Sequence, residues 1–126
     1  MTDMDLELCA SPAPIWPVVG EADAGLIRLS PRLQPLWQEY YLALAVFRPT
    51  VAARRFAAML AAYVEHFLER KEWVWSLDQA ALYSASGEAA RNLPNFRCAA
   101  LPFGFVASAN DPSDIALFRH YVASQG

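Results

Sequence analysis

The chain has 126 residues, enough for one domain with a hydrophobic core of its own. Apolar residues make up 56% of it and charged residues only 18%, whereas about 25% of an average globular chain is charged. Either a partner or a second copy covers part of the surface, or the chain is one part of a larger domain. The net charge of −3, without a basic stripe, argues against nucleic acid as a partner.

The sequence offers no segment suited to crossing or entering a membrane. The longest apolar run, residues 56–64, is far too short to span a bilayer. Residues 1–5 are acidic and lack the basic start and apolar stretch of a signal peptide. We therefore expect a cytoplasmic protein, in which Cys9 and Cys98 are free thiols buried like small apolar residues.

The first half of the chain is predicted to contain mainly strands. Residues 3–9 alternate polar and apolar side chains, as a half-buried strand does. The proline-rich residues 12–17 predict a loop, and residues 24–30 predict a second strand. Residues 33–41 allow only a helical turn or two, because a proline interrupts them. The continuous apolar run 42–48 predicts a buried central strand.

Two helices are predicted in the middle of the chain. From residue 51 to about residue 70, apolar side chains recur every three or four positions, and Thr50 is a suitable N-cap. The apolar face comprises Phe56, Met59, Leu60, Tyr63, Val64, Phe67 and Leu68. A second helix is expected from Ser76 to about residue 85, with Gly87 ending it.

The remaining patterns complete an α/β fold. Residues 96–100 and 115–122 predict two more short strands, with a loop at 101–114 between them. Because no repeat or linker divides the sequence, residues 1–126 are expected to form a single domain. We predict an α/β fold with a small mixed sheet of about five strands and two main helices.

Three polar residues have the types and spacing of a metal site. Asp3 and Asp5 stand two apart on the first predicted strand, so both carboxylates point to the same side. Such oxygen ligands suit Mn²⁺ or Mg²⁺, which bridges to substrate phosphates. His120 can complete the site. The alternatives are a solvated terminus for the acidic pair and a hydrogen-bonded core position for the histidine.

A second group of polar residues begins the second predicted helix. Asp78 and Gln79 lie in its first turn, just after Trp73 and Trp75. A carboxylate and a carboxamide can hold a polyhydroxylated ligand by directed hydrogen bonds, and flat indole rings can support a sugar ring. The alternative is structural, because an acid in the first turn complements the helix dipole and a glutamine there can simply be solvated.

The segment Trp-x-Leu-Asp-Gln-x-Ala-Leu at residues 75–82 resembles one near the C-terminal end of many nucleotide-sugar glycosyltransferases. The order of the other features is also similar to that family. Asp-x-Asp comes first, at residues 3–5, and Ala-Gly-Leu-Ile follows at 24–27. A strand then runs into Thr50 and a long helix, and His-Tyr comes last at 120–121. Together they resemble the C-terminal half of a glycogenin-like glycosyltransferase of the GT-A type.

The resemblance implies a partial GT-A fold that binds a nucleotide-sugar diphosphate through a divalent metal, Mn²⁺ or Mg²⁺. Asp3, Asp5 and His120 would be the metal ligands, and Asp78 and Gln79 would be catalytic residues that face the donor sugar. The reaction implied is hexosyl transfer from a nucleotide sugar to an unknown acceptor. Two departures from the family predict a truncated or inactive form: no nucleotide-binding half precedes the Asp-x-Asp strand, and no phosphate-binding lysine follows the late histidine.

Two other functions stay open from the sequence. A non-enzymatic protein-interaction module, including a homo-oligomer, would explain the high apolar content as well as a missing N-terminal half does. A carbohydrate-binding module without catalysis would use Trp73, Trp75, Asp78 and Gln79. Dependence of binding on a metal separates the glycosyltransferase from both alternatives.

Overall fold

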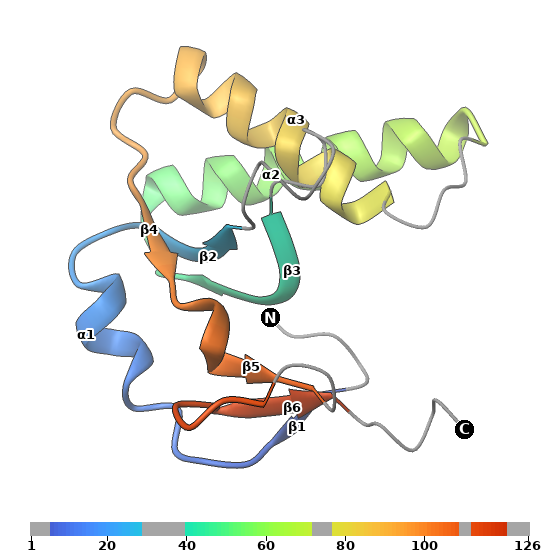
Figure 1. The fold of residues 1–126 in the computed structure, drawn as a ribbon. Coiled ribbons are helices and arrows are strands. Elements are labelled where there is room, and N and C mark those ends of the chain that lie inside the picture. The colour runs from blue at the N-terminus through green and yellow to red at the C-terminus, as the bar shows by residue number, and fades with distance from the viewer. Residues whose placement is uncertain (1–5, 29–39, 72–76, 109–111, 121–126) are drawn as a thin grey trace.

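The computed structural model describes residues 6–28, 40–71, 77–108 and 112–120. Within these ranges the elements are β1 (Leu6–Leu8), α1 (Ile15–Val19), β2 (Ala24–Arg28), β3 (Tyr40–Phe47), α2 (Val51–Glu69), α3 (Leu77–Asn92), β4 (Cys98–Leu101), the 3₁₀ turn η2 (Phe103–Phe105), β5 (Val106–Ala107) and β6 (Phe118–His120) (Figure 1). In these residues there is no helix long and apolar enough to cross a membrane.

The described strands form two mixed sheets of three strands each, in the orders β3-β2-β4 and β1-β6-β5. Strand β2 runs antiparallel to β3 and parallel to β4, while β6 runs antiparallel to β1 and parallel to β5. The predicted α/β class with two main helices is confirmed. The strands are shared between two sheets because the chain leaves the first sheet at Pro102, turns through η2 and continues as β5 in the second.

Helices α2 and α3 pack together on one face of the β3-β2-β4 sheet (Figure 1). The side chains of β2 alternate between the two faces, so Leu26 points toward the helices and Ile27 toward the opposite core. The core under the helices contains Leu26, Ala45, Phe56, Leu82, Ala85 and Ala89. At its centre the fully buried ring of Phe56 stacks on Phe96, with 4.4 Å between the ring centroids.

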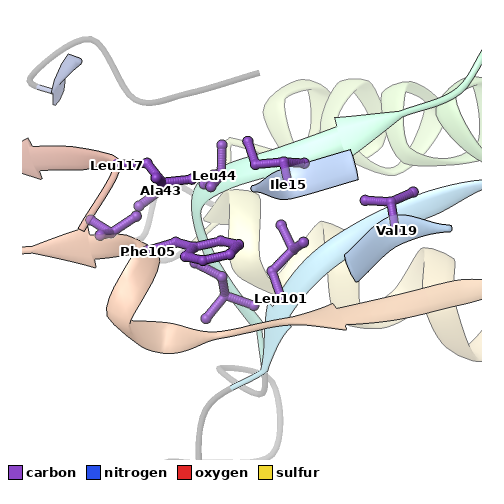
Figure 2. Close-up of a cluster of buried hydrophobic side chains, with 9 residues drawn as sticks. Ile15, Val19, Ala43, Leu44, Leu101, Phe105 and Leu117 are labelled. Carbon is purple, nitrogen blue, oxygen red and sulfur yellow. The ribbon is translucent and has the colours of Figure 1, made fainter. Parts of the chain in front are cut away.

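The opposite face of the same sheet packs against α1, η2 and the second sheet. Figure 2 shows side chains from these separate segments meeting in one apolar cluster. Its buried members are Ile15, Val19, Ile27, Ala43, Leu44, Leu101, Phe105, Val106 and Leu117. Gly25 faces this cluster, and a Cβ there would lie 3.0 Å from Val19 and Leu101 side-chain atoms, so a larger residue would force these side chains to shift by a few tenths of an ångström.

The prediction of the long helix is confirmed. The Thr50 hydroxyl accepts a hydrogen bond from the Ala53 amide at 3.1 Å, which is the expected N-cap. The predicted apolar face is buried at Phe56 and partly buried further along, but Leu68 is 40% exposed. The last turn of α2 therefore extends beyond the core.

A predicted loop and a predicted helix end are wrong. Residues 15–19 form the short helix α1 instead of a loop, because prolines are tolerated in a first turn whose amides have no intrahelical acceptor. Helix α3 continues through Gly87 to Asn92 instead of ending there. Gly87 does not have positive φ, and the turn after it buries Ala89 in the core under the helices.

Strand predictions are confirmed in position but not in every detail. Strand β3 begins at Tyr40, inside the segment predicted as a helical turn, and it lies at the edge of the described strands of its sheet, with β2 at the centre. Its apolar run is buried because residues 43–45 contact both cores. The predicted loop 101–114 contains η2 and β5, and residues 115–117 lie outside β6.

Both cysteines are exposed, which contradicts the expected burial. Cys9 follows the short strand β1, and Cys98 begins β4, which lies at the edge of the described strands of its sheet. Neither residue belongs to one of the two cores, but partial burial of the Cys98 sulfur raises the pKa of that thiol to about 11.

Asp23 is the buried charged residue among those described, with 9% of its surface exposed. Its carboxylate accepts hydrogen bonds from the Thr50 hydroxyl at 2.6 Å and from the Arg97 amide at 2.8 Å. These bonds lower the pKa of Asp23 below its ordinary value, the Thr50 bond most and the Arg97 bond next. The residue joins the start of β2 to the cap of α2 and to the segment before β4.

Candidate functional site

Gln79 attaches the start of α3 to the start of β3. Its side-chain amide donates a hydrogen bond to the Tyr40 carbonyl at 2.8 Å. The neighbouring Asp78 is exposed in the first turn of the helix, where its Oδ1 accepts the Gln79 backbone amide at 2.8 Å. The half-buried Gln79 side chain thus holds α3 against β3, whereas the exposed carboxylate of Asp78 is open to solvent.

His120 is half-buried at the end of β6, and its Nε2 is hydrogen-bonded to the hydroxyl of Tyr41. The two rings lie 6.0 Å apart between centroids. Metal-binding histidines are usually oriented by a hydrogen bond at the ring nitrogen that does not bind the metal. The Tyr41 hydroxyl can serve in this way if Nδ1 of His120 is the ligating atom.

The segment after the two predicted carboxylate ligands lies beside His120. Strand β1 pairs antiparallel with β6, with Leu6 opposite His120. Asp3 and Asp5 themselves lie outside the described residues, so His120 is the member of the predicted ligand set whose position is described. Residues 6–28, 40–71, 77–108 and 112–120 contain no cluster of three or more metal-binding side chains.

Tyr40 and Tyr41 connect the described parts of the predicted site. Consecutive strand residues point to opposite faces, so Tyr40 belongs to the core under the helices and Tyr41 to the opposite core. Gln79 and His120 therefore meet adjacent residues of β3 from the two sides of the sheet. Sequence reasoning missed both tyrosines, because they fell at the end of a predicted helical turn.

The aromatic part of the predicted sugar site, Trp73 and Trp75, lies outside the described residues. Of the predicted substrate-binding residues, the structure thus describes Asp78 and Gln79. Asp78 alone combines an exposed charged group with a position at the start of α3.

Comparison of the chain with protein-family models, with curated protein sequences and with solved structures finds no match.

Proposed function

We propose that this protein is a glycosyltransferase-like domain that binds a nucleotide sugar with the help of a divalent metal. The observation that carries the proposal is that three segments lie close to the start of β3, with Gln79 and His120 on opposite sides of the sheet. Strand β6 reaches it through His120, α3 through Gln79, and β1 lies next to β6. These are the segments that bear or adjoin the residues singled out by the resemblance to nucleotide-sugar glycosyltransferases.

In the proposed site, His120 would bind the metal together with Asp3 and Asp5. A bound Mn²⁺ or Mg²⁺ supplies Lewis-acid stabilisation to a departing diphosphate. Tyr41 would orient the imidazole of His120. Asp78 would accept hydrogen bonds from hydroxyl groups of the donor sugar, while Gln79 holds α3 against β3.

The chain's own contribution to transfer would be to position donor and acceptor, which is a large part of catalysis in bimolecular reactions. Gln79 is therefore proposed as a positioning residue, since its amide is engaged with a backbone carbonyl. The acceptor, the hexosyl-transfer activity and the cytoplasmic location expected from the sequence stay predictions.

A thermal-shift titration with Mn²⁺, UDP and a UDP-sugar, singly and together, tests the proposal. We expect a shift in melting temperature that requires both metal and nucleotide. His120→Gln should abolish that shift, whereas His66→Gln, which changes an exposed histidine on α2, should leave it intact. A metal-dependent shift that is unchanged in His120→Gln would refute the assignment of the ligand.

Two further variants separate folding from binding. Tyr41→Phe keeps the imidazole and removes only its hydroxyl partner, so metal affinity should fall by about 10–100-fold in a cooperatively folded protein. Asp78→Asn should fold normally and reduce the shift with UDP-sugar to that with UDP alone. An unfolded Asp78→Asn protein, seen by circular dichroism, would instead support a structural role for this acid at the start of the helix.

A protein-interaction module is the second candidate, favoured by an open groove of about 680 Å³ between α2 and α3. Met59, Ala62, Tyr63 and Leu93 contribute apolar surface to it. Sedimentation at increasing protein concentration distinguishes this function, because a self-associating module gains mass without metal or nucleotide. A strictly monomeric protein that binds neither ligand would argue against both self-association and the proposed donor site.

A further inference from the structure

A polar hollow of about 470 Å³ lies where the end of β2 and the start of β3 meet α2 and α3. Arginines from two distant parts of the chain line it, Arg28 at the end of β2 and Arg91 in the last turn of α3. The volume is within the range of about 300–1,000 Å³ typical of small-molecule sites. This hollow lies on the helix-covered side of β3, opposite the side on which Tyr41 meets His120.

The described lining of the hollow is positively charged. No acidic side chain is among its described lining residues, and Arg91 has no hydrogen-bond or ion-pair partner within the described part of the chain. Arg28 and Arg91 line the same hollow, and each guanidinium group can donate paired hydrogen bonds to an anion bound there. Glu88, one turn before the end of α3, acts on Tyr63; burial first and the negative charge of this glutamate next raise the pKa of the Tyr63 phenol.

Aromatic rings form the walls of the same hollow. Tyr40, Tyr63 and Tyr83 line it from three different elements. The guanidinium of Arg28 lies over the Tyr40 ring, 5.7 Å from its centroid, a contact that helps to hold the cation at the wall. Tyrosine rings present flat faces for a ring-shaped ligand and hydroxyl groups at their edges.

Hydroxyl groups complete the set of polar contacts. Ser84 and Ser86 line the hollow from α3, and each can both donate and accept a hydrogen bond. Arginine is the side chain best suited to paired hydrogen bonds with phosphate oxygens. The arrangement therefore combines groups for a phosphoryl anion with groups for a hydroxylated ring.

We propose that this hollow binds a phosphate monoester carried on a hydroxylated ring, with the phosphate between Arg28 and Arg91 and the ring against the tyrosines. Sugar phosphates and nucleoside monophosphates share this chemistry. The inference does not depend on the proposed metal-assisted site, because none of the hollow's contacts requires a metal.

Isothermal titration of the full chain with inorganic phosphate, a hexose 1-phosphate and a nucleoside monophosphate, all in the presence of EDTA, tests the inference. We expect at least one ester to bind more tightly than inorganic phosphate. Which ester binds more tightly identifies the source of the ring. Absence of binding by both esters, or equal binding of phosphate and esters, would overturn the proposal.

Variants locate the binding. Arg28→Gln and Arg91→Gln should each weaken ester binding by at least about tenfold, because each removes charged hydrogen bonds to the phosphate. Arg54→Gln is the matched control, since Arg54 is exposed on α2 and does not line the hollow. Thermal melts should show that all three variants fold. Undiminished binding in both hollow variants, or an equal loss in the control, would contradict the site.

The two proposals fail separately. Binding in the hollow should survive EDTA and His120→Gln, whereas the metal-assisted site should lose its ligand under both conditions. Ester binding that disappears under both conditions would belong to the metal-assisted site and would overturn the inference about the hollow.

Discussion

Replacing Asp23 with alanine should destabilise the fold strongly, although the residue lies outside both apolar cores. The change removes the acceptor of hydrogen bonds from the Thr50 hydroxyl at 2.6 Å and the Arg97 amide at 2.8 Å. Hydrogen bonds to a charged group contribute about 1.5–3 kcal/mol each. Because Thr50 is half-buried and its hydroxyl can turn to water, we expect a loss near the low end, roughly 3 kcal/mol for the two bonds.

Thermal melts followed by circular dichroism measure this loss. With an unfolding entropy of about 2.1 cal/mol/K per residue over 126 residues, the loss lowers Tm by roughly 11 °C. Asp114→Ala, which changes an exposed aspartate in a turn, is the control and should leave Tm nearly unchanged. If Asp23→Ala lowered Tm by less than about 3 °C, the two hydrogen bonds would contribute little to the stability of the fold.

The same pair of proteins gives a pH test. The folded-state pKa of Asp23 lies below the ordinary value of 3.8, chiefly because of the Thr50 hydrogen bond. Its stabilisation is therefore complete above pH 3.8 and is lost as the pH falls through the lower folded-state pKa. The difference in unfolding free energy between the native protein and Asp23→Ala should narrow in that acidic range, and a constant or growing difference would refute this argument.

Four other substitutions test the packing of α2 and α3. Phe56→Ala should lower the free energy of unfolding by about 3–5 kcal/mol because the ring is fully buried. Phe67→Ala should lower it clearly less because that ring is half-buried outside the core. Equal urea midpoints for the two variants would contradict this difference. Gly87→Ala should raise the free energy of unfolding by up to about 1 kcal/mol, because a Cβ at this position would contact only Arg91 Nη1, at 3.9 Å. A lower Tm would show that the helix needs this glycine. Gln79→Ala should lower the free energy of unfolding by about 1 kcal/mol, because it removes the hydrogen bond to the Tyr40 carbonyl. An unchanged Tm would show that this hydrogen bond does not contribute to stability.

Local patterns predicted the elements that the cores and caps stabilise. Thr50 and the apolar spacing after it identified α2 because a cap and one apolar face are both local signals. The end of α3 was not predictable in this way. Glycine after a polar turn is a common helix end, but the burial of Ala89 against the sheet continues the helix past Gly87.

The candidate site was only partly visible in the sequence. The residue types at Asp78 and Gln79 suggested ligand contacts for both, whereas the fold uses the Gln79 side chain to hold β3 and leaves Asp78 exposed. The tyrosine that binds His120 comes from a segment 79 positions earlier, a distance over which no local pattern operates. The hollow between Arg28 and Arg91 depends in the same way on elements that meet only after folding.

The sequence by itself determined the α/β class, the long capped helix and the approximate positions of most strands, because hydrophobic period and capping act within a few residues. The tertiary structure alone decided that the described strands divide into two sheets and that β3 lies at the edge of those described in its sheet. It also decided that Tyr40 and Tyr41 stand between Gln79 and His120. These outcomes depend on which apolar faces cover one another, a choice made between segments far apart in the chain.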